Sequence, residues 1–432
     1  MTGAAREWHT LAEASPAHDH AIAPVHPLLM TKPNLVTDVR GASRIVVDLT
    51  LIVTDLVETM HHNIARRPGI AGEATFARTK GITGLVYRGV RAVTKLVGAG
   101  IDTALAPLAP LLKERSAWPG REPFVAALNG VLGDHLAASH NPLAIAMHLR
   151  AGGAPLDLTA EGIAAAVPDP RACIILLVHG LCMSDANWQR QGHDHGRKLA
   201  RELDANALYL RYNTGLHIAD NGEALSALLA QLVERWPVPK TQLVLVGHSM
   251  GGLVIRSAYA AAERAGHGWR ARVRALAFLG TPHHGAPLER GGQGIDLLLA
   301  ASPYTAAFTR LSRMRSAGIT DLRHGTVRAE DRQGHARFDH HVDARTPLPL
   351  PASVPCFTIA GSLSKTAPRT ARLPRGDGLV PVASALGRHP DVRMQLDFPS
   401  SRQHIALGTG HLDLLSSASV YRKLREWLRE VR

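Results

Sequence analysis

The chain has 432 residues, of which 45% are hydrophobic, and it carries a formal net charge of +13. Its length predicts more than one region, and its apolar residues suffice for a large core, although aromatic residues make up only 4% of the chain. The positive charge would fit a nucleic-acid partner, but the sequence has no run of five basic residues and no nucleic-acid-binding motif, so we exclude that class.

Targeting signals and cysteines predict the compartment. The N-terminal residues lack the basic start and the continuous apolar stretch of a secretory signal. No window of about 18 uncharged apolar residues is present, as a membrane-spanning helix would need. The three cysteines, Cys173, Cys182 and Cys356, are too few for a disulfide framework. We therefore expect a cytoplasmic protein, with peripheral contact at a membrane or lipid surface left open.

Residues 1–140 are predicted to form a helical region of unknown role. Apolar residues recur at three- and four-residue spacing over 45–60 and again over 86–108, which is the pattern of amphipathic helices. A third helix is expected over 124–136. The face opposite the second stripe carries basic residues: Arg88, Arg91 and Lys95.

Residues 141–432 change to the pattern of an α/β domain. A hairpin is expected where alternating apolar residues flank Gly152 and Gly153. After it, short apolar runs alternate with helical stretches, which predicts right-handed crossovers and a mostly parallel, doubly wound sheet. The expected strands are 173–178, 207–212, 242–246, 273–279, 354–359 and 392–398, and the expected helices are 196–203, 222–236, 250–265 and 417–428. Residues 283–350 interrupt this alternation, and so long a connection commonly forms a lid or cap.

The motif Gly247-His248-Ser249-Met250-Gly251 lies between an expected strand and an expected helix. That context is typical of a nucleophile elbow, in which a tight turn lifts the serine hydroxyl above the edge of the sheet. The two glycines leave room for the turn, because larger side chains would collide with neighbouring backbone. We therefore predict Ser249 as the nucleophile; the alternative is a Gly-Ser-Gly turn without chemistry.

A serine nucleophile needs a histidine base and an acid that orients the histidine. In the fold that uses this elbow, the acid and then the histidine follow the serine along the chain. Asp377, in a glycine-flanked loop after the strand expected at 354–359, is the predicted acid, and a turn-forming aspartate is the alternative. Two histidines follow the strand expected at 392–398. His411 directly precedes the last helix and is the predicted base, with His404 as the alternative.

A negative charge that develops on a substrate oxygen needs two preorganised backbone donors. Met250, the residue after the nucleophile, is predicted to supply one amide. The second amide is expected from the loop after His179-Gly180, at the end of the first strongly apolar strand. We assign it to Leu181, with Cys182 as the alternative and a purely structural glycine turn as a third interpretation.

These motifs, together with Gly280-Thr-Pro-His-His-Gly285 and His411-Leu-Asp-Leu-Leu415, resemble those of bacterial lipases and esterases, especially the branch related to GPI inositol-deacylases. The resemblance covers about residues 172–432. It implies an α/β-hydrolase fold with a cap insertion, and carboxylic-ester hydrolysis through an acyl-serine intermediate. The first 140 residues match no pattern of that family.

Two other kinds of function stay open at this point. An acyltransferase or a thioesterase would use the same triad, since the motifs specify neither the acceptor nor the leaving group. A membrane- or granule-surface binding protein with secondary hydrolase activity would use the basic amphipathic stripe at 86–108. Docking of that helix against the catalytic domain is the alternative interpretation of the stripe.

Histidine and aspartate clusters could suggest a metal site. With 24 histidines in the chain, however, pairs such as His283-His284 and the run at 339–343 arise easily. Neither has an HExxH or Cys-His spacing, so we expect no catalytic metal and no cofactor, with a structural ion in the cap as the alternative. Cys182 is expected to be a packed thiol. The expected substrate is a small-molecule or lipid ester.

Overall fold

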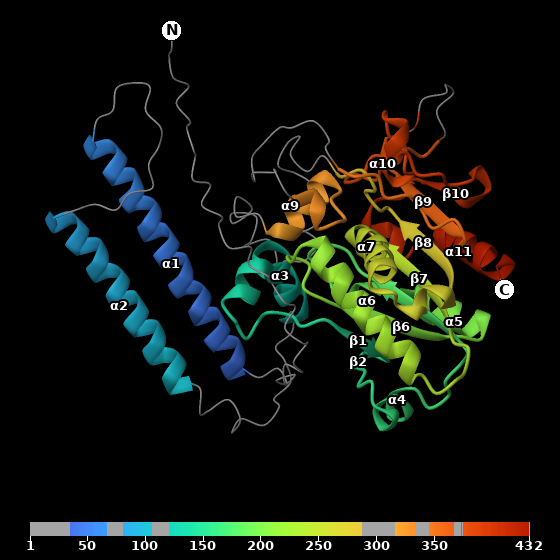
Figure 1. The fold of residues 1–432 in the computed structure, drawn as a ribbon, viewed down its shortest axis with the longest axis horizontal. Helices are drawn as coiled ribbons and strands as arrows, with labels where there is room; N and C mark the ends of the chain where they lie inside the picture. The colour runs from blue at the N-terminus through green and yellow to red at the C-terminus, as the bar shows by residue number, and fades with distance from the viewer. Residues whose placement is uncertain are drawn as a thin grey trace, which may run out of the picture. The chain divides into compact units, whose positions relative to one another are not determined.

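The computed structural model describes residues 35–66, 81–105, 121–286, 316–332, 345–366, 373 and 375–431. Within these residues, eight strands form one sheet in the order β10-β9-β8-β7-β3-β6-β1-β2 (Figure 1). β1 pairs antiparallel with β2 and β6, whereas β10, β9, β8, β7, β3 and β6 run parallel to one another. The strands are β1 His148–Ala151, β2 Ala154–Pro155, β3 Cys173–Val178, β6 Asn206–Arg211, β7 Gln242–His248, β8 Val273–Leu279, β9 Cys356–Ser362 and β10 Gln403–Leu407, and a separate two-stranded ribbon pairs β4 Gln189–Arg190 with β5 His193–Asp194.

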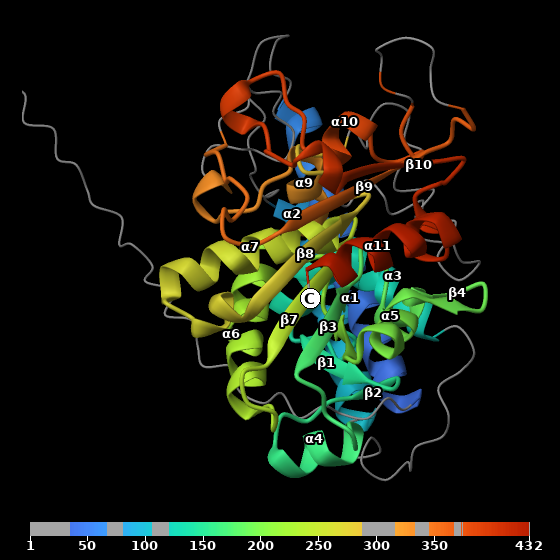
Figure 2. The same ribbon diagram turned by 90° about the vertical axis from the view of Figure 1, so that its right-hand side faces the viewer.

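Helices cover both faces of the sheet. Side chains of α3, α6 and α7 form one core with the sheet, and those of α5 and α11 form the other (Figure 2). Side chains alternate along β3 in the same way: Ile174 and Leu176 belong to the first core, and Ile175 and Leu177 to the second. The helices are α1 Leu35–Arg66, α2 Gly81–Leu105, α3 Arg121–Ala138, α4 Ala160–Ala166, α5 His195–Leu203, α6 Ile218–Arg235, α7 Met250–Ala265, α9 Ala317–His324, α10 Val382–Ala385 and α11 Ala418–Glu430.

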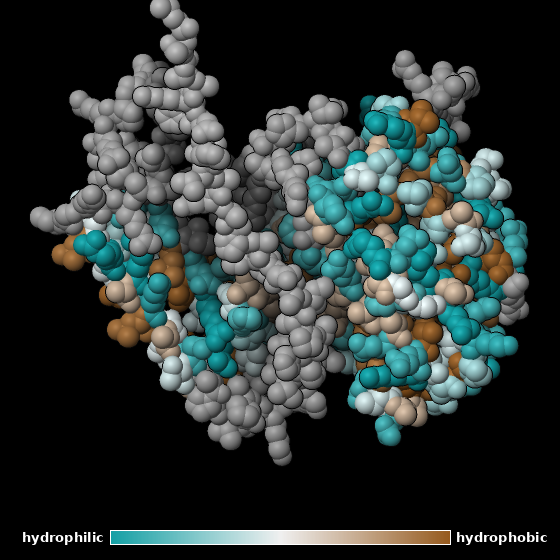
Figure 3. Space-filling view, viewed as in Figure 1, coloured by the Kyte–Doolittle hydropathy of each residue, from teal (hydrophilic) through white to brown (hydrophobic). Residues whose placement is uncertain are grey.

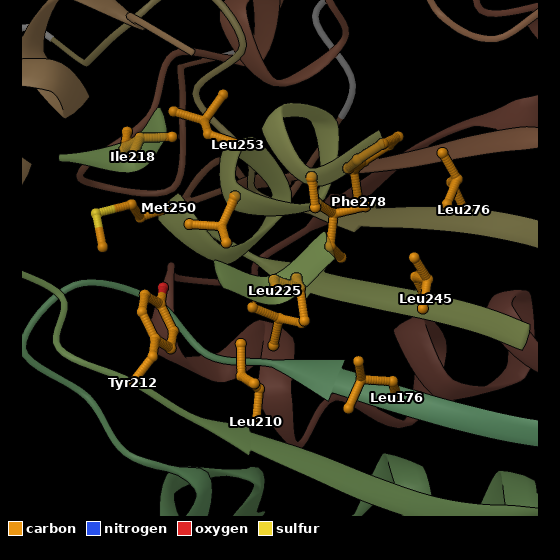
Figure 4. Close-up of a cluster of buried hydrophobic side chains, with 14 of the residues drawn as sticks. Leu176, Leu210, Tyr212, Ile218, Leu225, Leu245, Met250, Leu253, Leu276 and Phe278 are labelled. Carbon is orange, nitrogen blue, oxygen red and sulfur yellow. The ribbon is translucent and has the colours of Figure 1, made fainter. Parts of the chain in front are cut away.

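The core on the α6–α7 side supports the candidate elbow from below. Met250 and Leu253 of α7 are fully buried, as are Leu245 of β7 and Leu225 of α6 (Figure 4). Because helices cover both faces of the parallel strands, these strands are nearly continuous apolar runs. The turn that follows β7 is therefore held between a buried strand and a buried helix.

Most predicted elements are confirmed. The bounds of β3, β8 and α7 coincide with the predicted ranges, and β6, β7, β9, α5, α6 and α11 lie within a few residues of theirs. The predicted hairpin is formed by β1 and β2, with Arg150 opposite Pro155. These elements together make the mostly parallel, doubly wound sheet that the alternation of strands and helices predicts.

The strand predicted at 392–398 is wrong. Residues Val392–Met394 form a short 3-10 helix, and the last strand of the sheet is β10, which contains His404. Apolar and polar residues alternate over this segment as they do in a strand, and two of the apolar side chains, Leu396 and Phe398, are buried. Their amides, however, bond to the carbonyls of Gly387 and Leu396, so this segment packs as a loop and does not join the ladder.

The region before residue 140 contributes in two different ways. α3 lies in the same core as β3 and β6, through side chains that include Val125, Leu128, Val131 and Leu136. α1 and α2 pack against each other, and α1 contacts α3 through an ion pair in which Arg121 bonds to Asp38 at 2.8 Å. The division of the chain at residue 140 stays a prediction.

The long insertion at 283–350 is described only in part. Ser316, at the start of α9, donates a hydrogen bond from Oγ to the Gly130 carbonyl at 2.6 Å. Asp321 of the same helix accepts hydrogen bonds from His217 and from the Ile218 amide, at 3.0 and 2.9 Å. α9 is thus bonded to α3 and to the start of α6. Residues 287–315 and 333–344 of the predicted cap lie outside the described residues.

Candidate active site

Ser249 lies in the turn between β7 and α7, with φ 54° and ψ −126°. A positive φ is uncommon for a residue with a side chain, and such strain persists only where the surroundings hold it. The Ser249 amide donates to the Leu279 carbonyl at 2.9 Å, which ties the turn to β8. A Cβ on Gly251 would lie 2.2 Å from the Val178 carbonyl oxygen, and one on Gly247 would lie 2.6 Å from the Gly252 Cα. Both glycines of the motif are therefore required by close backbone contacts.

Asp377 and His411 form a buried pair. His411 Nδ1 lies 2.7 Å from Asp377 Oδ2, and each side chain is only 1% exposed. The other carboxylate oxygen of Asp377 accepts the amides of Leu379 and Val380, at 3.0 and 2.8 Å. The His411 amide also donates to the Asp377 carbonyl, at 3.0 Å. These bonds fix the orientation of both the carboxylate and the imidazole.

The second ring nitrogen of His411 is available for chemistry. Nε2 is buried, and no described group forms a hydrogen bond to it. Because Nδ1 faces the carboxylate, Nε2 is the nitrogen that can accept a proton from a nucleophile.

His248 links this histidine to the elbow. Its Nε2 bonds to the His411 carbonyl oxygen at 3.0 Å, and the two ring centroids are 4.7 Å apart. Burial, and then the neighbouring His411, lower the pKa of His248 well below its ordinary value, so it is a neutral donor here. The residue directly before Ser249 thus bonds to the loop that carries His411, and the elbow and the Asp377–His411 pair lie together.

His404 has a different environment. It is a half-buried residue of β10, opposite Ile359 of β9 in the parallel ladder. Burial, followed by the charge of Lys423 on α11, lowers its pKa. Its charged neighbours, Lys423 and Glu426, lie on α11.

The loop after β3 reaches the nucleophile. A Cβ on Gly180 would lie 2.9 Å from the Ser249 Cβ, so only glycine allows this approach. The Cys182 amide donates to Thr214 Oγ1 at 3.2 Å. Among the hydrogen bonds within the described residues, none uses the amides of Leu181 or Met250. Met250 is the first residue of α7, where an amide has no partner inside its own helix.

Two residues of the site were missed from the sequence, and both follow β6. Tyr212 donates its hydroxyl to the His179 carbonyl at 2.8 Å, and its ring stacks on His179 with centroids 4.5 Å apart. Thr214 holds the Cys182 amide, as described above. Burial lowers the pKa of His179 to about 4, which leaves this histidine neutral. The signal in the sequence was the run Tyr212-Asn-Thr-Gly215, polar residues that follow directly after an apolar strand.

The surroundings of the other candidate residues indicate a role in packing. Burial raises the pKa of the Cys182 thiol to about 12, which disfavours the thiolate that a nucleophile needs. His283 is buried beside the rings of Phe278 and Phe398. Among the described residues, no group of three or more histidine, cysteine or acidic side chains could hold a metal ion, and the run at 339–343 lies outside them.

Part of the chain is similar to known proteins. A family model described as a PGAP1-like alpha/beta domain matches residues 169–341. Among solved structures, the mature form of the Bacillus licheniformis lipase BlEst2 is 18% identical, with 61% of this chain and 93% of the lipase covered and a TM-score of 0.37. An esterase from Thermogutta terrifontis is 18% identical over 61% of this chain and 91% of its own, with a TM-score of 0.33. The thioesterase RedJ from Streptomyces coelicolor is 15% identical over 61% and 89%, with a TM-score of 0.34.

No curated protein matches the chain in sequence. The mostly parallel sheet flanked by helices, with a strained serine turn between a strand and a helix, defines the class by its fold: the chain has an α/β-hydrolase fold. Within that class, residues 169–341 are similar to a PGAP1-like alpha/beta domain.

Proposed function

We propose that the protein hydrolyses carboxylic esters through an acyl-serine intermediate, with Ser249, His411 and Asp377 as the catalytic triad. One observation carries the proposal. The Asp377–His411 pair is buried with His411 Nδ1 at 2.7 Å from the carboxylate, and the His411 carbonyl accepts a hydrogen bond from His248, the residue before Ser249. His411 Nε2 and the serine hydroxyl are not hydrogen-bonded in this structure. Catalytic hydrogen bonds are often long in the absence of substrate.

The first half of the reaction forms the acyl-enzyme. His411 Nε2 takes the proton from Ser249 as Oγ attacks the ester carbonyl carbon, and Asp377 holds the imidazole in the tautomer with its proton on Nδ1. The carbonyl oxygen becomes an oxyanion in the tetrahedral intermediate. When that intermediate collapses, the bond to the alkoxy oxygen breaks, and the His411 imidazolium gives its proton to the leaving alcohol.

Water completes the cycle. His411 takes a proton from a water molecule, and the resulting hydroxide attacks the acyl carbon. The second tetrahedral intermediate releases the carboxylic acid and returns the proton to Ser249 Oγ. The enzyme regains its starting state without a cofactor.

The oxyanion is proposed to bind the amides of Met250 and Leu181. Both amides lack an intramolecular partner among the described hydrogen bonds, whereas Thr214 already holds the Cys182 amide. Donors that are in place before the reaction stabilise the charge without reorganisation. The close approach of Gly180 to Ser249 supports a position of this loop next to the reacting carbon.

Replacement of the nucleophile tests the proposal. We expect Ser249→Ala to abolish hydrolysis of p-nitrophenyl acetate and labelling by a fluorophosphonate probe, while the protein melts at the parent temperature. Ser257→Ala, a change at a second buried serine of α7, is the matched control and should keep both signals. Probe labelling that persists in folded Ser249→Ala would exclude Ser249 as the nucleophile. An added alcohol that intercepts the acyl-enzyme better than water would assign the activity to acyl transfer.

A further inference from the structure

Ion pairs join the helices α1 and α2. Arg91 of α2 pairs with Asp55 of α1 and with Glu58, whose side chain is 3% exposed. Asp102 of α2 accepts from Arg44 and Arg40 of α1, at 2.6 and 2.9 Å. These two ion-pair groups, Arg91 with its acids and Asp102 with its arginines, hold the helices together.

The apolar residues of α2 face away from this interface. Seven of them are between 38% and 74% exposed: Leu85, Val86, Val90, Val93, Leu96, Val97 and Ile101. Figure 3 shows brown, apolar side chains gathered along this helix pair, at the left of the view. A Cβ on Gly89 or Gly100 would meet no atom within 4 Å. We call this set of seven side chains the outer face of α2.

The outer face is wide and uncharged. At about 100° per residue, its side chains span an arc of roughly 160°, and no charged residue falls inside that arc. Two exposed cations, Arg88 and Lys95, lie outside the arc, about 60° and 80° beyond its edge at Leu85, between that edge and the side that faces α1. The acidic residue of α2, Asp102, is already held by two arginines.

We propose that the outer face of α2 binds an anionic lipid surface, with the helix lying in the plane of the interface. A helix that packs on one other helix needs only a narrow seam, whereas a helix in a lipid interface immerses about half of its circumference. Arg88 and Lys95 complement anionic headgroups, because their long aliphatic stems allow the charges to reach from the side of the helix to the phosphates. If a second copy of this chain bound here instead, Arg88 and Lys95 would meet another α2 that carries the same two cations. The acidic residue of that helix, Asp102, is already paired with two arginines and would not offset them.

Insertion across the bilayer is a different arrangement. None of the helices in the described ranges is both long and apolar enough to cross a membrane. α2 also carries Arg91 and Asp102 on its α1 side, where they remain paired if the helix lies flat. Because Arg91 and Asp102 are paired with residues of α1, neither charge has to enter the lipid when the outer face of α2 binds the surface.

Vesicle binding by the full-length chain tests the proposal. The wild-type protein should co-sediment with phosphatidylcholine vesicles that contain phosphatidylglycerol, and more weakly with phosphatidylcholine alone. Leu96→Asp places a charge at the most exposed side chain of the arc and should weaken binding at least about tenfold. Val392→Asp is the matched control, because Val392 is 80% exposed compared with 74% for Leu96 but lies in the α/β domain. This control should bind as the wild type does.

A second variant tests the role of charge. Arg88→Gln with Lys95→Gln should weaken binding to the anionic vesicles by roughly tenfold and leave the weak binding to phosphatidylcholine unchanged. Equal binding of wild type and Leu96→Asp, or no sedimentation of the wild type, would overturn the proposal. A wild-type dimer in light scattering that Leu96→Asp converts to a monomer would also overturn it and assign the face to a second copy.

These results are separable from the proposed catalysis. Leu96→Asp should hydrolyse soluble p-nitrophenyl acetate at the wild-type rate, because α2 contributes no group to the candidate active site. A chain that binds vesicles but hydrolyses no ester would contradict the proposed function alone. A chain that hydrolyses esters but ignores vesicles would contradict the lipid surface alone.

Discussion

In the α/β core, Leu176 and Leu245 are completely buried between strands and helices, and exposed positions carry most of the charge. In the α1–α2 pair, the pairing of Arg91 with Glu58 lies inside, while Val93 and Leu96 face outward. The first arrangement is the one that is favourable in water, because it removes apolar area from solvent. The second indicates that the surroundings of α2 are not water alone.

The two regions also differ in what holds them together. Apolar burial stabilises the core in proportion to the area removed from water. The ion pairs between α1 and α2 depend on the protonation of their carboxylates. Lowering the pH or changing one residue should therefore affect the two regions differently, and the predictions below use that difference.

The largest expected effect concerns the base. We expect His411→Ala to lower kcat by about 10⁶-fold, as Ser249→Ala should, because triad residues act as a unit. The double variant should be no slower than either single variant. His404→Ala should keep most of the activity, since His404 lies on β10 with α11 as its charged neighbour. Rates with p-nitrophenyl acetate check this, and an inactive His404→Ala would transfer the base role to His404.

The next effect concerns the backbone of the loop after β3. Leu181→Pro removes an amide that has no hydrogen-bond partner among the described residues, and we expect turnover to fall by roughly 10²–10³-fold. Leu181→Ala retains the amide and should retain most of the activity. The amide that Cys182→Pro removes bonds to Thr214, so that variant should lose stability more than it loses turnover per folded molecule. Single-turnover rates and melting temperatures separate the two losses. A crippled Cys182→Pro beside a normal Leu181→Pro would move the donor role to Cys182.

Two leucine truncations compare the regions directly. Leu245→Ala in β7 creates a cavity in a fully buried core and should cost roughly 2–5 kcal/mol of unfolding free energy. Leu96→Ala on the outer face of α2 should change the unfolding free energy by no more than about 0.5 kcal/mol. Urea denaturation of both variants measures the difference. Similar costs at the two positions would mean that Leu96 is packed in solution.

The smallest effect is the pH dependence of the helix pair. Hydrogen bonds from Arg44 and Arg40 lower the pKa of Asp102 to about 2 from an ordinary 3.8. A lowered pKa in the folded state means that Asp102 stabilises the fold fully above the ordinary value, and that this stabilisation is lost as the pH falls towards 2. The gap in unfolding free energy between wild type and Asp102→Asn should therefore shrink between pH about 5 and about 2. A gap that stays constant over that range would show that the two arginines do not hold the ionised carboxylate.

Local patterns in the sequence determined much of the α/β domain. The ranges of β3, β8 and α7 follow from continuous apolar runs and from helical periodicity, which depend on neighbouring residues alone. The turn at Ser249 follows from glycine spacing between a strand and a helix, because the steric demand of that turn is local. Chain order then led to Asp377 and His411, which the structure brings together as a buried pair.

Other features depend on contacts between distant parts of the chain. Residues 392–398 alternate as a strand does, but this segment is a loop whose Leu396 and Phe398 are buried in the core, and the edge strand is the more polar β10. The difference between the Leu181 and Cys182 amides arises from Thr214, which lies 32 residues further on. No local pattern contains that information.

The orientation of α2 shows the same limit most clearly. Periodicity identified an apolar stripe and a basic face, yet it does not specify which face meets a neighbour. Only the tertiary structure places Arg91 and Asp102 against α1, because the choice depends on the complementary acids and arginines that α1 presents. A sequence determines which faces a helix has, and the partners brought to it by the fold decide which face is buried.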